Sequence, residues 1–198
     1  MSARIHRKLA SRERTGFSLL ELLVVVAVLG LLAVLVVPSL QGVLGGRRLD
    51  TAANIVSSQL QLARQTALSR NALVQWQIVK VPDPRSGDPA AFRLVRCLIM
   101  ESGSRQWKPL GRTEWLPIAY WVDEDATRSP LLNQSTTAAG ISPANSPAAW
   151  VTFDGAGRVT LSSSGNWLTL VGRSNPADII AVQIDPVNGR VRNFRPGA

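Results

Sequence analysis

Residues 17–37 read FSLLELLVVVAVLGLLAVLVV, a run of 21 residues with one charged side chain, Glu21. A helix that spans a bilayer needs about 20 mostly apolar residues. A secretory signal peptide has a shorter apolar region and a small-residue cleavage site after it, which this run lacks. Residues 1–16 carry five Lys or Arg side chains and one acid, and such basic flanks stay in the cytoplasm. We therefore expect a single membrane-spanning helix, with the N-terminus in the cytoplasm and the later residues in the periplasm or outside the cell.

Glu21 is the exception within this run. A carboxylate inside an apolar helix costs about 2.5–3.5 kcal/mol on insertion scales, so it should have a partner or a role. One interpretation places Glu21 near the end of the helix, where it reaches the lipid headgroups. The other begins with cleavage between Gly16 and Phe17, which creates an amino group one helical turn from Glu21. The amine of a neighbouring subunit then neutralises the carboxylate inside the membrane.

The residues around this position resemble the processing site of a known family. Residues 14–21, RTGFSLLE, are similar to the prepilin peptidase recognition site of type IV pilins and type II secretion pseudopilins. The resemblance implies cleavage after Gly16, methylation of the new N-terminal Phe17, and a role for Glu21 in filament assembly. Pro38 follows Phe17 by 21 residues, where the family commonly has a helix-kinking proline. The implied partners are prepilin peptidase, other pilins of the same filament, and the inner membrane.

A helix-weakening segment follows the apolar run. Pro38 lacks a backbone donor, and each of three glycines within residues 42–46 costs about 1 kcal/mol in a helix. The segment is either a linker or a soft part of a longer helix. From Arg47 to Arg70 the apolar residues again follow helical spacing, which predicts an amphipathic helix packed on a sheet. The predicted buried stripe consists of Leu49, Ala52, Ala53, Val56, Leu60, Ala63 and Ala67.

After Asn71 the apolar period changes to two, which predicts strands. The turn signals include residues 154–157 and Asn188-Gly189, a pair that favours a mirror-type hairpin turn. Residues 82–89 and 123–147 are predicted loops, and a loop as long as the second is often functional or disordered. The predicted strands are residues 73–80, 92–100, 115–122, 150–154, 158–162, 166–171, 179–185 and 190–194.

The predicted fold class is therefore α+β, with a long N-terminal helix packed on an antiparallel β-sheet head. We divide the chain into a cytoplasmic leader, residues 1–16, a transmembrane and filament-core helix, residues 17–46, and a periplasmic head, residues 47–198. The six tryptophans are expected mostly in the core, with Trp107 as the best candidate for an exposed stacking residue.

The C-terminal half resembles one group within the pilin family. Residues 151–159 (VTFDGAGRV), 180–184 (IAVQI) and 188–192 (NGRVR) are similar to GspH/FimT-like minor pilins and pseudopilins. The resemblance implies a long helix packed on two antiparallel sheets. It also implies a structural subunit of a type IV pilus-like or type II secretion filament, which primes assembly or lies at the tip. Residues 123–147 and the six tryptophans depart from that pattern.

Three arginines near the C-terminus suggest an alternative function. On a strand, Arg190 and Arg192 project to the same face, Arg195 follows closely, and guanidinium groups bind phosphates as planar forks. Some FimT-like minor pilins bind DNA during uptake through a Gly-Arg-x-Arg motif, which residues 189–192 match. The alternative function is thus DNA capture by a competence pilus. The same arginines could instead be a solvated basic strand edge that resists aggregation.

The composition excludes most enzyme chemistry. His6 is the only histidine and lies in the leader, so a processed chain has no Ser-His-Asp or Cys-His site and few zinc ligands. Cys97 is the only cysteine and can form no internal disulfide. The acidic run at residues 123–125 lacks the spaced oxygens and the glycine of a calcium loop. We expect no enzyme, no cofactor and no metal site.

The processing site leads to a first prediction. Mass spectrometry of the protein extracted from membranes should find a chain that begins at Phe17 and carries an N-methyl group. Replacing Gly16 by leucine should block this cleavage, because the peptidase would meet a bulky side chain beside the scissile bond. A mature chain that still begins at Met1 would contradict the proposed site.

Overall fold

The computed structural model describes residues 18–100, 106–133, 136–137 and 146–196, and the side chains of all of these except 34–46 and 136–137. The predicted cleavage site between Gly16 and Phe17 lies outside the described residues. The chain divides into two compact units, residues 1–42 and 43–198. One helix, α1 (Leu19–Arg70), begins in the first unit and ends in the second.

In the first unit, α1 has no core. Every described side chain from residue 18 to residue 33 is exposed, including leucines and valines such as Leu20, which is 73% exposed. Within the part of the chain that the structure describes, no helix is both long enough and apolar enough to cross a membrane. The backbone of α1 remains helical at Pro38 and at the glycines of residues 42–46. The segment is therefore part of one longer helix.

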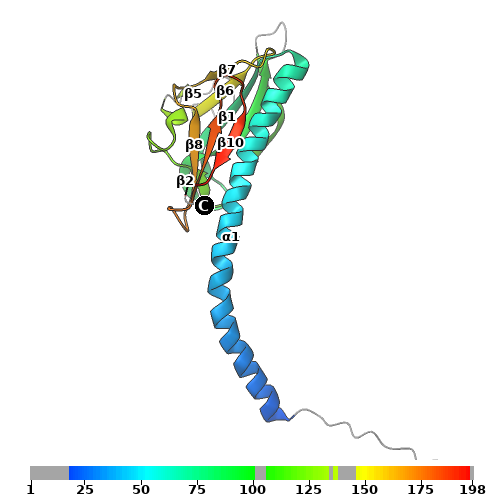
Figure 1. Ribbon diagram of the computed structural model, residues 1–198, viewed down its shortest axis with the longest axis vertical. Helices are drawn as coiled ribbons and strands as arrows, with labels where there is room; N and C mark the ends of the chain where they lie inside the picture. The colour runs from blue at the N-terminus through cyan, green and yellow to red at the C-terminus, as the bar shows by residue number, and fades with distance from the viewer. Residues whose placement is uncertain (1–17, 101–105, 134–135, 138–145, 197–198) are drawn as a thin grey trace, which may run out of the picture. The chain divides into compact units, whose positions relative to one another are not determined.

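In the second unit, α1 packs its apolar stripe on the sheet as predicted. All seven residues of the stripe are at most 2% exposed. The helix ends at Arg70, and Asn71 takes a left-handed backbone conformation with φ of 46°, which stops a helix. Ser57 of α1 donates a hydrogen bond of 2.6 Å to Oδ1 of Asn193 in β10 (Val191–Phe194), and Figure 1 shows this strand next to the helix. The helix-on-sheet architecture confirms the predicted α+β fold.

Ten strands among the described residues form an antiparallel sheet in the order β10-β9-β8-β4-β2-β1-β6-β5, with β3 on β2 and β7 on β6. The strands are β1 (Val74–Asp83), β2 (Asp88–Met100), β3 (Trp107–Trp115), β4 (Tyr120–Val122), β5 (Thr136–Thr137), β6 (Pro147–Phe153), β7 (Val159–Leu161), β8 (Trp167–Gly172), β9 (Ile179–Ile184) and β10 (Val191–Phe194).

The sheet consists of two strand groups with a narrow junction. The first group contains β1, β2, β3, β5, β6 and β7, and the second contains β4, β8, β9 and β10. Between β2 and β4 the paired register is a single residue pair, Phe92 and Val122. Both groups contribute to one hydrophobic core under α1, for example through Trp76 and Leu170. The two sheets implied by the resemblance thus correspond to two groups of one connected sheet.

The strand predicted at residues 115–122 is wrong. Trp115 ends β3, a strand that the sequence pattern missed, and β4 begins only at Tyr120. Pro117 cannot donate a hydrogen bond to a neighbouring strand, and Ala119 has φ of 69°, so the chain turns between the two. The pattern missed β3 because its residues are mostly polar and exposed.

The segment predicted as a long loop at residues 123–147 contains ordered structure. A short 3-10 helix, η1 (Pro130–Leu132), places Leu131 and Leu132 in the core. Ser163 donates a hydrogen bond of 2.7 Å to the Pro130 carbonyl. A Cβ atom at Gly165 would lie 2.4 Å from Pro130 Cβ, so this glycine lets the segment pack closely. The loop prediction failed because two leucines in a polar segment give no periodic signal.

The tryptophans and one turn also differ from expectation. Trp76 is fully buried, whereas the other five are half-buried or exposed, so the core expectation is wrong for most of them. Trp107 is half-buried in β3, and Trp167 is the most exposed at 38%. At Asn188-Gly189 only the glycine has positive φ, 67°. A mirror-type turn needs positive φ at both residues, so that prediction is also wrong.

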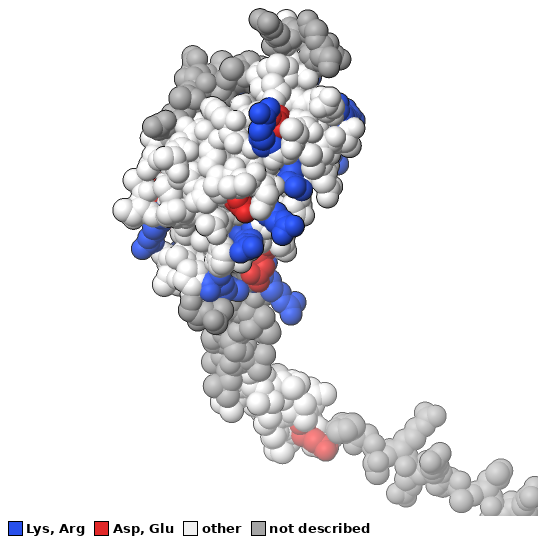
Figure 2. All heavy atoms as spheres, turned by 45° about the horizontal axis from the view of Figure 1, so that its top comes forward, with Lys and Arg blue, Asp and Glu red and all other residues white. Residues whose placement is uncertain are grey.

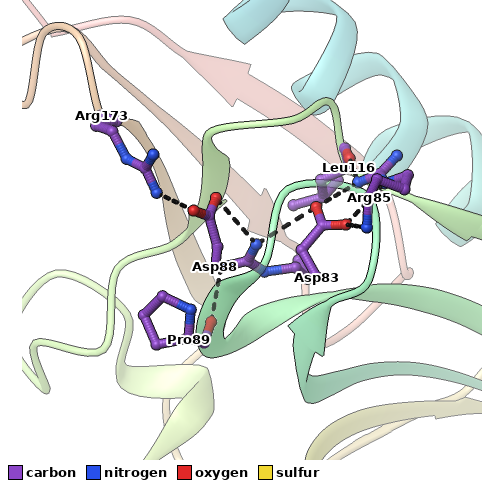
Figure 3. Close-up of polar contacts among 7 residues, drawn as sticks. Asp83, Arg85, Asp88, Pro89, Leu116 and Arg173 are labelled. Carbon is purple, nitrogen blue, oxygen red and sulfur yellow. Dashed lines mark hydrogen bonds and ion pairs between the residues drawn. The ribbon is translucent and has the colours of Figure 1, made fainter.

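A cluster of five charged residues, of which Asp83, Asp88 and Arg93 are buried, lies where the two strand groups meet (Figure 3). Asp83 ends β1 and accepts two hydrogen bonds of 2.9 and 2.7 Å from the guanidinium of Arg85. Arg93 lies between Asp83 and Asp88, with N···O distances of 3.4 and 3.6 Å. Arg173, which follows β8, pairs with Asp88. We call these five residues the ion cluster.

The ion cluster ties the β1–β2 turn to both strand groups. Arg85 also donates a hydrogen bond of 2.8 Å to the Leu116 carbonyl in the β3–β4 connection. The side chains of Asp83 and Arg93 are 1% and 3% exposed, and a buried charge is tolerated only with its partners in place. The hydrogen bond from Arg85 holds the pKa of Asp83 well below its usual 3.8. The hydrogen bond from Arg173 likewise lowers the pKa of Asp88.

We expect Asp83→Asn to destabilise the head strongly. Removing one partner of a buried ion pair typically costs about 3–5 kcal/mol, because the other charge is left uncompensated. Glu124→Gln is the matched control, since the pair between Glu124 and Lys80 is partly exposed and such pairs contribute at most about 1 kcal/mol. Urea denaturation followed by tryptophan fluorescence measures both variants, because all six tryptophans lie in the second unit. Equal destabilisation of the two variants would contradict the role of the ion cluster.

The lowered carboxylate pKa values also predict acid sensitivity. The unfolded chain binds protons near pH 3.8 that Asp83 and Asp88 do not bind in the folded chain, so this stabilisation is complete above that pH and is lost below it. The second unit contains no histidine, so its stability should change little between about pH 5 and 8. Urea denaturation at a series of pH values should show this profile, with a shallower acid decline in Asp83→Asn. An acid decline of unchanged slope in that variant would assign the effect to other carboxylates.

Candidate functional site

Two surfaces of the described residues are candidates for function, and the first is the exposed start of α1. Glu21 lies in the first turn of the helix and is exposed. Leucine and valine side chains surround it on every side of the helix, because all described residues from 18 to 33 are exposed. Exposed apolar surface of this extent is typical of sites that contact membranes or other proteins.

The second surface is the hairpin formed by β9 and β10. Its turn is built around Asp185, whose Oδ1 accepts hydrogen bonds from the backbone N–H groups of Val187 and Asn188 at 2.9 and 3.4 Å. The bond from Val187 is the main cause of a lowered pKa at Asp185. Arg64 of α1 donates a hydrogen bond of 2.9 Å to the Asn188 carbonyl, which fixes the turn to the helix.

A pocket of about 230 Å³ opens beside this turn. Arg190 and Arg192 both line it, so the structure brings together the first two arginines of the predicted set. Both side chains are exposed. The pocket is lined by Asn166, Gln183, Asp185, Pro186, Arg190 and Arg192; we call it the hairpin pocket.

The third predicted arginine does not belong to the hairpin pocket. Arg195 donates hydrogen bonds of 2.9 and 2.8 Å to the two carboxylate oxygens of Asp178. It also lies 3.3 Å from Asp50 of α1. The bond to Asp178 raises the pKa of Arg195. Arg195 thus joins the C-terminus to the head, and the predicted group of three arginines is reduced to two.

The charges of the head are mixed. On the face shown in Figure 2, Lys and Arg side chains lie in separate groups with acidic side chains between some of them. In the acidic run at residues 123–125, Asp123 pairs with Arg128 and Glu124 with Lys80. Asp125 accepts hydrogen bonds from Thr127. These acids are therefore engaged by protein groups.

Sequence reasoning missed one exposed residue beside the hairpin pocket. Trp167 of β8 is paired in register with Gln183 of β9, which is paired with Arg192 of β10. These three side chains share one face of the sheet, since the neighbouring Leu168 and Val182 are in the core. Strand alternation was the available signal: if Leu168 and Leu170 face inward, Trp167 faces outward.

Known protein families match most of this chain. Residues 11–37 match the family described as prokaryotic N-terminal methylation motif. Residues 52–189 match the family described as type II transport protein GspH. No curated protein matches the chain.

Two solved structures are similar to this chain at low sequence identity. The minor pseudopilin EpsH of the type 2 secretion system of Vibrio cholerae has 15% identity and a TM-score of 0.45, and the match covers 76% of this chain and 99% of EpsH. The type IV minor pilin FimU of Pseudomonas aeruginosa has 17% identity and a TM-score of 0.46, and the match covers 77% of this chain and 95% of FimU.

The GspH match spans well over half of the chain, and the methylation motif lies on its N-terminal side. This chain therefore belongs to the GspH family and is a GspH-like type IV pilin with an N-terminal methylation motif.

Proposed function

We propose that this protein is a minor pilin or pseudopilin, a structural subunit that primes assembly or occupies the tip of a type IV pilus-like or type II secretion filament. The observation that carries the proposal is the contrast between the two parts of α1. The seven stripe residues between Leu49 and Ala67 are buried in the head, whereas every described side chain from residue 18 to residue 33 is exposed. Apolar surface of this extent is stabilised when lipid or other protein chains cover it.

Two environments supply that cover in succession. Before assembly, residues 17–46 cross the inner membrane once, with the leader, residues 1–16, in the cytoplasm and the head, residues 47–198, in the periplasm. Prepilin peptidase removes the leader. In the filament, the corresponding helices of neighbouring subunits replace the lipid. The family match and the basic leader support this sequence of events.

Glu21 and Pro38 have distinct roles in this proposal. Glu21 has no cation within the described residues around it, and a carboxylate in lipid is costly. Pairing with the α-amino group of a neighbouring subunit's Phe17 removes that cost only when subunits associate. Pro38 leaves one carbonyl of the helix without its usual donor, which makes this part of α1 the easiest to unwind as the subunit leaves the membrane.

Capture of DNA by a competence pilus is the second candidate, and the exposure of Arg190 and Arg192 on one pocket is the observation that favours it. Two guanidinium groups remain for this task, since Arg195 is paired with Asp178 and Asp50. Fewer phosphate contacts mean weaker binding and a smaller dependence on salt.

Glu21→Ala tests the structural proposal. Membrane insertion should be unchanged or improved, because a costly carboxylate is removed from the apolar helix. Incorporation into complexes with co-expressed partner pilins should fall, because the pairing with the neighbouring amine is lost. Leu20→Ala is the matched control, since it shortens an adjacent exposed side chain and leaves the charge in place. Affinity capture of the full-length variants measures incorporation, and full assembly of Glu21→Ala would show that the carboxylate only reaches the headgroups.

A further inference from the structure

The hairpin pocket presents donors and acceptors side by side. Asn166 uses one N–H to bond the Ile184 carbonyl at 3.0 Å, which leaves its amide oxygen as an acceptor and its second N–H as a donor. Asp185 uses Oδ1 for the turn, so its second oxygen remains an acceptor. Gln183 adds a further amide, and the two arginines add donors. Hydroxyl groups both donate and accept, and they therefore fit this lining better than a group that only accepts.

The negative charge of Asp185 affects neutral and anionic ligands differently. Its carboxylate lies in the same pocket as Arg190 and Arg192, and backbone N–H groups that bond to it lower its pKa. The carboxylate offsets one of the two arginine charges, so a phosphate gains less attraction here than at two arginines alone. A neutral polyol loses nothing by this and can use the carboxylate as an acceptor.

Trp167 supplies an apolar surface next to these polar groups. It is the direct cross-strand neighbour of Gln183, and directly opposed side chains on one face lie about 5 Å apart. Trp167 is 38% exposed, more than any other tryptophan of the chain. The ring of a pyranose has an apolar face of C–H groups and a rim of hydroxyls. It can lie against the indole while its hydroxyls enter the pocket, which at about 230 Å³ is the size of a single sugar residue rather than a larger ligand.

We propose that the hairpin pocket, together with Trp167, binds one pyranose ring of a glycan chain. The face of the sugar packs on Trp167, and its hydroxyls bond to the amides, to Asp185 and to Arg192. Such a site would attach the head to a polysaccharide that it meets outside the inner membrane. Two sources carry this chemistry: a cell-wall glycan with acetamido groups and a polysaccharide of plain hexoses.

Calorimetric titration of the full-length protein tests the proposal, in a detergent whose headgroup contains no sugar. The probes are chitohexaose, which carries acetamido groups, cellohexaose, which does not, and a short DNA duplex. At least one hexaose should bind, and its affinity should change little between about 50 and 200 mM salt, unlike that of a phosphate ligand. Binding of chitohexaose alone would assign the cell-wall source, and binding of cellohexaose alone or of both would assign the pyranose ring itself.

Two variants locate the site. Trp167→Ala should weaken hexaose binding about tenfold, the loss expected when a stacked aromatic face is removed. Trp107→Ala is the matched control, because Trp107 lies in β3 of the other strand group. Arg192→Gln should weaken binding as well, and thermal melting checks that all variants fold. Absence of binding to both hexaoses, unchanged binding by Trp167→Ala, or displacement of a bound hexaose by the DNA duplex would overturn the proposal. None of these outcomes bears on filament assembly, which the Glu21 variant tests separately.

Discussion

The contact between α1 and the sheet is the constraint on which the rest of the head depends. Four of the seven residues of the buried stripe are alanines, among them Ala63 and Ala67. Small side chains bring a helix close to the surface beneath it, while Leu49, Val56 and Leu60 fill the spaces between strands. The two strand groups share one backbone pair, so the helix is the element that packs on both of them. Without it, neither group has a closed core.

The sequence predicts the helix and the strands whose apolar residues recur at a regular spacing. The helical stripe, the helix end at Arg70 and seven of the strands follow from repeats of 3.6 or two, because burial on one side imposes that spacing. The features that were not predicted depend on contacts between residues far apart in the sequence. Leu131 is buried by β6 and β8, and no pattern within its own polar segment predicts this burial. Trp167 was assigned to the core because large aromatics are usually buried, although its alternation with Leu168 pointed outward.

The candidate sites also differ in whether local sequence or distant contacts determine them. Residues near the N-terminus form a local motif, so the processing site and Glu21 can be predicted from the sequence alone. The arginines also form a local motif, but their availability depends on partners outside it. Arg195 pairs with Asp178 and also with Asp50, which lies 145 residues earlier. A motif therefore specifies which side chains are present, whereas the fold decides which of them remain available for a ligand.

The narrow junction between the strand groups has a mechanical consequence. Tension on a filament subunit reaches the head through α1. The bonds that resist this tension in parallel share the load. Where the groups meet, those bonds include the Phe92–Val122 pair and the ion cluster, in which Arg173 pairs with Asp88 across the gap. We expect the head to yield there first, in shear, with each group intact. The buried charges would thus set the force at which the subunit deforms, independently of the many hydrogen bonds within each group.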